Sequence, residues 1–139
     1  SRGRGIFLIK DPFSDLKYDQ QYIVQHYIQR PLLVGGYKMD IRIYVLVRSF
    51  KPLRAYIYRD GLARFGTEKY EANVEDIGNF YSHLTNASIN KYSKTFSTEK
   101  DVIGAGCKWT FGQLKSWFEE NGHDWENMWG CTRNIISLT

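Results

Sequence analysis

Cysteine is scarce in this sequence, which has only Cys107 and Cys131 among its 139 residues. Two cysteines are too few for a disulfide scaffold, and neither belongs to a C-x-x-C pair of the zinc-binding type. Long apolar runs are also lacking, since no stretch approaches the ~20 residues of a membrane-spanning helix. Nothing resembles the charged start, apolar middle and cleavage site of a secretory signal. We therefore expect free thiols in a reducing compartment and neither a membrane-spanning nor a secreted protein.

Repeats, low-complexity runs and long linkers are absent as well. With 42% hydrophobic and 24% charged residues, the composition is that of an ordinary globular chain with one core. The sequence opens on Ser1 and then directly on R-G-R-G, which places its first residue inside a motif. We expect one domain or part of one, and interpret the chain as a fragment.

Charge is distributed unevenly along the chain. Residues 1–65 contain 12 Lys and Arg against 5 Asp and Glu, whereas residues 66–139 contain 7 against 10. A basic first half suits an anionic partner such as a nucleotide, a nucleic acid or an acidic protein tail. A solvated basic surface would explain the same charges, so charge alone does not decide.

Strand patterns dominate the first half of the sequence. Residues 5–10 form a short apolar run followed by turn residues, and residues 22–28 are rich in β-branched and aromatic side chains, so each predicts a strand. The clearest pattern covers residues 38–49, where side chains alternate between two faces. One face of that strand is apolar and consists of Met39, Ile41, Ile43, Val45 and Val47.

The opposite face of the same strand has three charges, on Lys38, Asp40 and Arg42. Burying an unpaired charge is costly, so these groups must reach solvent or pair with something. One interpretation is a salt-bridged solvent face. The other is a cleft in which the two cations meet phosphates and the carboxylate positions one of them.

The remaining elements follow from turn and capping signals. Residues 54–65 predict a hairpin around Arg59-Asp60-Gly61, because Asp-Gly favours tight turns, which gives three successive antiparallel strands. Residues 66–108 are polar and irregular. Thr110 with Gln113 forms a capping box that begins one helix, Asn121-Gly122 ends it, and Asp124 caps a second helix. Strands followed by helices predict an α+β fold.

Other candidate residues are weak when taken singly. Arg64 offers a fork for a carboxylate and Lys108 lies on a glycine-containing loop, but each could be an ordinary surface cation. Residues 83–91 form a polar cluster in the long loop. The three histidines are scattered, which suggests structural roles and no metal site. Most aromatic residues lie at core spacing, so we expect packing in place of base stacking.

Six motifs taken together identify the chain. In order they are R-G-R-G-I (2–6), V-Q-H-Y-I (24–28), P-L-L-V-G-G-Y-K-M-D-I-R-I-Y-V-L-V (31–47), G-L-A-R-F (61–65), H-L-T-N-A-S-I-N-K (83–91) and G-C-K-W-T (106–110). Each motif is weak alone, but the ordered set, which covers nearly the whole chain, resembles the tubulin-tyrosine-ligase-like family. Residues 102–110 are most similar to its polyglutamylase branch.

This resemblance implies the central and C-terminal region of an ATP-grasp-type fold, with antiparallel strands followed by helices. It also implies a ligase that uses ATP and Mg²⁺ to activate a carboxylate as an acyl phosphate, which an amine then attacks. In the polyglutamylase branch the carboxylate is a glutamate side chain on an acidic tubulin tail, and the amine is that of free L-glutamate. Expected partners are therefore tubulin and microtubules, with no nucleic acid and no membrane. Expected locations are the cytoplasm and cytoskeleton, with the cilium or basal body as further microtubule sites.

Family roles transfer to matching positions as implications of the resemblance. Cofactor-binding positions are Arg2, Gly3, Gln25, His26, Tyr27, Ile28, Lys38, Met39, Asp40, Thr85 and Asn86. Substrate-binding positions are Arg2, near the acceptor protein, and Arg64, Ser88 and Lys108, near the free amino acid. Arg42 takes the catalytic position beside the phosphates. A cleft lined by cations suits a reaction driven by positioning and charge neutralisation.

The sequence departs from the family pattern in three places. The family's Lys-Pro pair would lie before residue 1, and the acidic and Asn ligands of magnesium beyond Thr139. We therefore expect these 139 residues alone to be catalytically inactive. Met39 replaces a usual Phe, a conservative change. The alternatives are a glycylase of the same family, which would not need Arg64 and Lys108 for a side-chain carboxylate, and a noncatalytic microtubule-binding module.

Overall fold

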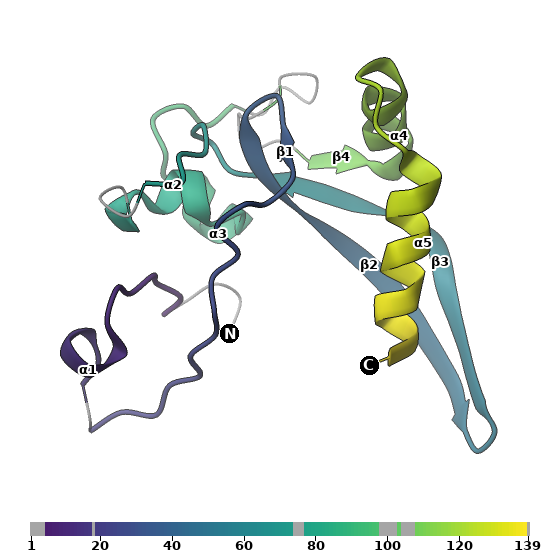
Figure 1. Ribbon diagram of the computed structural model, residues 1–139, viewed down its shortest axis with the longest axis horizontal. Coiled ribbons are helices and arrows are strands. Elements are labelled where there is room, and N and C mark those ends of the chain that lie inside the picture. The colour runs from purple at the N-terminus through teal and green to yellow at the C-terminus, as the bar shows by residue number, and fades with distance from the viewer. Residues whose placement is uncertain (1–4, 18, 74–76, 98–102, 104–107, 139) are drawn as a thin grey trace. The chain divides into compact units, whose positions relative to one another are not determined.

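The computed structural model describes residues 5–17, 19–73, 77–97, 103 and 108–138 as a mixed arrangement of short helices and one antiparallel sheet (Figure 1). In chain order the elements are α1 (Pro12–Asp15), β1 (Leu33–Val34), β2 (Tyr37–Phe50), β3 (Leu53–Phe65), α2 (Phe80–His83), α3 (Ala87–Asn90), β4 (Lys108–Thr110), α4 (Phe111–Glu120) and α5 (Trp125–Leu138). The expected succession of strands and then longer helices is confirmed. Of the helices in these ranges, none combines the length and the apolarity needed to cross a membrane.

The sheet has the strand order β1-β2-β3-β4. Strands β1 and β2 are antiparallel with Leu33 opposite Lys38, and Gly35 and Gly36 make the turn with φ of 59° and 86°. Such left-handed backbone favours glycine. The long strand expected over residues 38–49 is confirmed by β2, which Figure 1 shows running beside β3.

Three sequence expectations about strands are wrong. The hairpin turn lies at Lys51-Pro52, and β3 continues without interruption through Asp60-Gly61. There are therefore two strands, not three, between residues 37 and 65. Residues 5–10 and 22–28 are extended but belong to no strand. Apolar side chains of both segments are exposed, with exposed fractions of 49% at Ile6 and 93% at Ile23.

The chain divides into two compact units. The first comprises Ser1–Asp40 and Arg64–Lys108, and the second comprises Ile41–Ala63 and Trp109–Thr139. In the first unit the buried apolar side chains are Val34, Phe65 and Leu84, but six buried residues are polar: Thr67, Ser82, His83, Thr85, Asn90 and Ser93. Buried polar groups must be hydrogen-bonded to persist, so this unit is organised by a polar network.

The second unit has an aromatic core. Phe111, Leu114 and Phe118 are buried on one face of α4, as their spacing predicts. The Phe111 ring packs against Trp125 and Trp129 of α5 with centroid distances of 5.9 and 5.6 Å. The Thr110–Gln113 capping box begins α4, Gly122 with φ of 70° follows its end, and the Asp124 carboxylate accepts a hydrogen bond from the Asn127 amide at 2.9 Å. The predicted capping is confirmed.

Candidate functional site

Asp40 is the centre of a polar cluster in the first unit. Its carboxylate accepts hydrogen bonds from Arg64 Nε at 2.6 Å and from Arg64 Nη2 at 2.8 Å. The Thr85 hydroxyl donates to the same carboxylate. A residue on β2, one on β3 and one in the loop after α2 therefore meet at one carboxylate. Asp40 and Arg64 retain 36% and 28% of their side-chain exposure, so the pair borders solvent.

Lys38 lies two residues before Asp40 on β2 and makes a second group of contacts. Its ammonium donates to the Tyr27 hydroxyl at 2.9 Å and to the His83 carbonyl oxygen at 2.8 Å. The Lys38 nitrogen also lies 4.3 Å from the centroid of the Tyr27 ring, which favours a cation. Tyr27 and His83 are linked in turn, with 2.9 Å between the phenol oxygen and His83 Nδ1.

Burial changes the proton affinities of this group. It lowers the pKa of the Lys38 ammonium, which the nearby charge of Asp40 partly offsets. It also raises the pKa of the Tyr27 phenol, and the neighbouring Tyr70 hydroxyl adds to that rise. Tyr27 is therefore a neutral phenol at every physiological pH, whereas Lys38 is a cation with a weakened hold on its proton.

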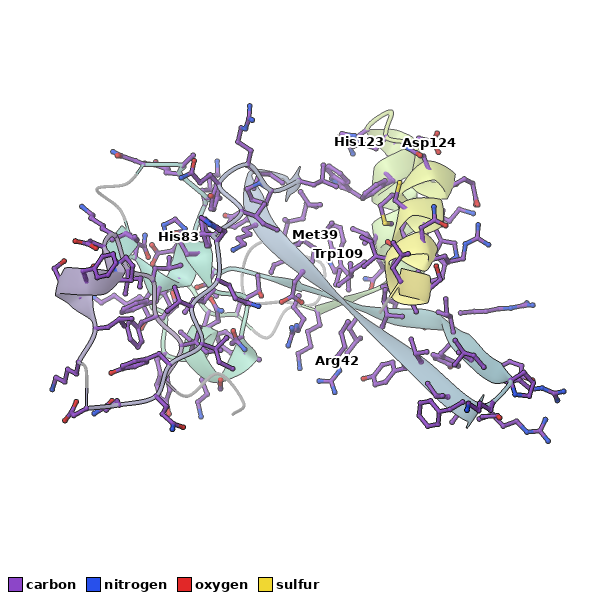
Figure 2. The ribbon with its side chains drawn as sticks, turned by 60° about the horizontal axis from the view of Figure 1, so that its bottom comes forward. Met39, Arg42, His83, Trp109, His123 and Asp124 are labelled. Atoms are coloured by element: carbon purple, nitrogen blue, oxygen red, sulfur yellow. The ribbon has the colours of Figure 1, made fainter. Side chains whose placement is uncertain are left out.

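A cavity of about 180 Å³ adjoins this group. Tyr27, Tyr70 and His83 line it together with Leu8, Ile77 and Lys10. The His83 ring is 4% exposed, and its Nε2 atom has no hydrogen-bond partner among the described residues. A buried imidazole nitrogen without a partner is costly, so His83 is a residue at which the described contacts leave one polar atom unsatisfied. Figure 2 marks His83 within the group of short helices.

A larger cavity of about 780 Å³ is formed by the extended segments of the first unit. Gln25, His26 and Tyr27 line it with apolar residues such as Ile6 and Val24. Of the expected cofactor-binding segment 25–28, Gln25, His26 and Tyr27 therefore border this cavity, and Tyr27 also borders the smaller one. That position suits contacts to a ligand through backbone groups.

Asn90 fixes the loop between α2 and α3, which follows His83 and contains Thr85. It is 1% exposed, and its amide oxygen accepts from both the backbone and the hydroxyl of Thr67 at 3.0 and 2.9 Å. Its amide nitrogen donates to the carbonyl oxygens of Leu84 and Asn86 at 2.6 and 3.1 Å. Because every hydrogen-bonding group of this side chain is used, Asn90 fixes the backbone on either side of Thr85.

The structure brings together four of the residues expected to bind ligands, namely Tyr27, Lys38, Asp40 and Thr85, with Arg64 from the substrate-binding set. Met39, labelled in Figure 2, is half-buried on the other face of β2. Gln25, His26 and Ile28 are exposed. Asn86 is the N-cap residue of α3, while Ser88 and Lys108 are exposed.

Arg42, the expected catalytic residue, falls in the second unit, where its guanidinium lies 5.3 Å from the centroid of the Tyr44 ring. Figure 2 labels it on β2. Arg2 and Gly3 lie outside the described residues. None of the ligand-binding roles is tested by these contacts, and each stays a prediction.

His83, Tyr70 and Asn90 were missed by sequence reasoning as parts of the site. His83 was assigned a purely structural role, but it contacts Lys38 and Tyr27 and borders the cavity. The available signal was the run H-L-T-N, in which His83 is the last residue of α2 and Thr85 lies two residues later, in the loop before α3. In the part of the chain that the structure describes, no group of three His, Cys, Asp or Glu side chains could hold a metal ion.

The arrangement is suited to an anionic, hydroxyl-bearing ligand. Lys38 and Arg64 supply two cations within one unit, and the guanidinium has three further N–H groups beyond the two that Asp40 engages. The Asp40 carboxylate and the Thr85 oxygen can accept hydrogen bonds from a sugar hydroxyl, whereas the two cations can bind a phosphate. Cations held by a fixed carboxylate are preorganised, which is what binding of a phosphate requires.

Comparison with known proteins identifies the family of the chain. Residues 1–139 match the Tubulin-tyrosine ligase family. The chain is 53% identical over its whole length to the human protein named Probable tubulin polyglutamylase TTLL2, of which it covers 23%. It is 40% identical over 99% of its length to mouse Tubulin polyglutamylase TTLL13, covering 17% of it, and 36% identical over its whole length to human Tubulin polyglutamylase TTLL5, covering 11% of it. The chain therefore spans less than a quarter of the length of these relatives.

Proposed function

Because the chain belongs to the tubulin-tyrosine ligase family, we propose that it is part of the ATP-grasp catalytic domain of a tubulin polyglutamylase. The proposed enzyme acts in the cytoplasm on microtubules, including those of cilia or basal bodies, and adds L-glutamate to glutamate side chains of the acidic tubulin tails. The carrying observation is that residues from β2, β3 and the loop after α2 converge on Asp40, in a chain 53% identical to a probable tubulin polyglutamylase.

The proposed reaction has two steps. A glutamate carboxylate of the tubulin tail attacks the terminal phosphorus of ATP, which forms an acyl phosphate and releases ADP. The amine of free glutamate then attacks the acyl carbon, which forms an amide bond and releases phosphate. Both steps gain from cations that neutralise the transferring group and from rigid positioning of the reactants.

The residues of the first unit support nucleotide binding. Lys38 provides a half-buried cation, and Asp40 with Thr85 provides an acceptor and a hydroxyl within one cluster. Tyr27 and His83, which contact Lys38, also line a cavity. Magnesium would neutralise the phosphates, and we place its ligands outside this chain.

Arg64 and Lys108 support the choice of glutamate over glycine. Two carboxylates of the free amino acid need two cations, whereas glycine offers only one carboxylate. Arg64 already holds Asp40 with two N–H groups and can hold a ligand carboxylate with the others. Ser88 joins these residues in the proposed amino-acid site, and Arg42 remains the proposed phosphate-side catalytic residue.

The test uses the full-length protein with microtubules, Mg²⁺ and ATP, and compares incorporation of labelled glutamate and labelled glycine. We expect glutamate alone to be incorporated, and Lys38→Met to abolish the reaction. Lys115→Met is the control, because Lys115 is an exposed lysine that pairs with Glu119 on α4. Incorporation of glycine alone would show that the amino acid added is glycine and not glutamate. ATP-independent microtubule binding without any transfer would favour the noncatalytic microtubule-binding module.

The same assay with the isolated 139 residues tests whether this chain alone is catalytically active. We expect no transfer from this chain alone, since the proposed metal ligands lie outside it. Detectable transfer would place the whole catalytic machinery within residues 1–139.

A further inference from the structure

The Tyr27 hydroxyl contacts both Lys38 and His83. On one side it lies 2.9 Å from Lys38 Nζ, and on the other side it lies 2.9 Å from His83 Nδ1. The Lys38 ammonium also donates to the His83 backbone carbonyl at 2.8 Å, which closes a ring of contacts among the three residues. None of these residues is fully exposed, so solvent does not replace the contacts freely.

Proton counting gives this ring a direction. An ammonium has only donors, so the Tyr27 oxygen accepts from Lys38. Accepting from a cation makes a phenol a stronger donor and a poorer second acceptor. The contact between Tyr27 and His83 joins the phenol oxygen and Nδ1. Imidazole nitrogen is the more basic of these two atoms, so the phenol donates its hydrogen to His83 Nδ1. The proton of the neutral imidazole is then on Nε2.

We propose that Tyr27 is a positioning residue whose hydroxyl holds the Lys38 ammonium in place for the bound nucleotide and fixes His83 in the Nε2–H tautomer. This inference rests on the proposed function, because it names the residue that positions the proposed nucleotide-binding Lys38. In it Lys38 contacts the ligand directly, and Tyr27 acts through Lys38.

Two aromatic neighbours fix the orientation of the His83 ring. It is held edge-on by Tyr27 and by Tyr70, with centroid distances of 5.6 and 5.3 Å. Its Nε2 atom is buried and has no hydrogen-bond partner among the described residues. A fixed imidazole that accepts at Nδ1 keeps the Tyr27 hydroxyl, and with it the Lys38 ammonium, in one position before a ligand binds.

Loss of the hydroxyl has a second expected consequence, for Lys38. The titratable groups that face its ammonium are Asp40 on the same strand, Tyr27 and, across the ring of contacts, His83, with Tyr70 behind Tyr27. Removing the phenol oxygen removes an acceptor for the charged form. The proton is then lost at lower pH, so the alkaline fall in activity moves toward neutrality.

The experiment compares Tyr27→Phe with the unaltered full-length protein. We expect the KM for ATP to rise about five- to tenfold with kcat changed less than twofold, and the alkaline limb of kcat/KM to move to lower pH. In protein labelled with ¹⁵N-histidine, with the His83 signal assigned by its loss in His83→Gln, we expect the Nε2–H tautomer in the unaltered protein and a mixture in Tyr27→Phe.

Tyr92→Phe is the matched control, because it also removes one phenol hydroxyl from the first unit but at a residue 71% exposed. We expect it to leave KM, the pH profile and the His83 signal unchanged. An Nδ1–H tautomer in the unaltered protein would overturn the inference, as would a Tyr27→Phe variant that loses only thermal stability. An unaltered protein with neither ATP binding nor transfer would instead refute the proposed function, and the tautomer measurement would still decide the proton order.

Discussion

Arg64 holds Asp40 with two parallel hydrogen bonds, Nε to Oδ1 at 2.6 Å and Nη2 to Oδ2 at 2.8 Å. A planar guanidinium and a carboxylate match each other in this fork geometry, which fixes both side chains at once. The contact joins β2 to β3 between residues 24 positions apart in sequence. The orientations of Asp40, proposed to bind a nucleotide, and of Arg64, proposed to bind an amino acid, are therefore coupled.

This coupling predicts that Arg64→Lys is not a conservative change. A lysine can offer only a point charge, so Asp40 loses its second hydrogen bond and its fixed orientation. We expect the KM for glutamate and the KM for ATP both to rise at least fivefold. In a double-mutant cycle with Asp40→Asn, thermal stability should show a coupling of about 1 kcal/mol, because the pair borders solvent. Additive effects would mean that the two residues act independently.

Thr85 gives a sharper test of the Asp40 carboxylate. Its side chain is 7% exposed and donates to Asp40. Thr85→Val keeps the shape but removes the donor, so we expect weaker ATP binding, by about fivefold, with little change in the glutamate KM. Thr85→Ser keeps the hydroxyl and should bind ATP within twofold of the unaltered protein. Equal ATP dissociation constants for the Val and Ser variants, measured by calorimetry, would remove the hydroxyl from the site.

Asn90 is expected to be the residue of the first unit that is least tolerant of change. Removing its amide would take away the hydrogen bonds that Asn90 makes to the Thr67 hydroxyl and to the Leu84 carbonyl oxygen. We expect Asn90→Ala to lower the free energy of unfolding by about 3 kcal/mol, measured by urea denaturation, and to weaken ATP binding through the displaced loop. Asn134→Ala, at an exposed position on α5, should be neutral or slightly stabilising. Similar stabilities of the two variants would contradict this role.

The elements that sequence predicted well are those whose signals are local. Strand β2 follows from alternating side chains, and the start of α4 follows from a Thr and a Gln three residues apart. The extended segment 22–28 was predicted as a strand for a local reason too. Strand pairing needs a partner, however, and none of the described residues pairs with it, so propensity alone overstated its order.

The site could be predicted from the sequence only in part, for a similar reason. The spacing of Lys38 and Asp40 placed both charges on one face of a strand, and this is confirmed by their shared environment. The partners could not be read from spacing, since Asp40 meets Thr85 and Lys38 meets His83 at a separation of 45 residues. The sequence predicted Tyr27 only as one of several cofactor-binding residues. The contact of its hydroxyl with Lys38 is visible only in the fold.

Gly61 shows how a tertiary contact overrides a turn signal. The Asp60-Gly61 pair favours a tight turn, but in the structure Asp60 Oδ1 accepts from the Phe111 amide at 3.1 Å and β3 continues through both residues. A Cβ atom at Gly61 would lie 2.5 Å from the Arg42 carbonyl oxygen and 2.5 Å from the edge of the Phe111 ring. The glycine is thus required for close packing of β3, within the second unit, and not for a turn.

Gly61→Ala should therefore destabilise the second unit strongly. The Arg42 backbone and the buried Phe111 ring cannot both move away from the added methyl group. We therefore expect a loss of about 2–3 kcal/mol in the free energy of unfolding and a matching fall in Tm. Gly130→Ala is the matched control, because a Cβ there meets nothing within 4 Å and the residue lies inside α5. Alanine should stabilise that helix by up to about 1 kcal/mol. A Gly61→Ala variant as stable as the Gly130→Ala variant would show that β3 shifts to accommodate the methyl group, and that Asp60-Gly61 retains the freedom of a turn.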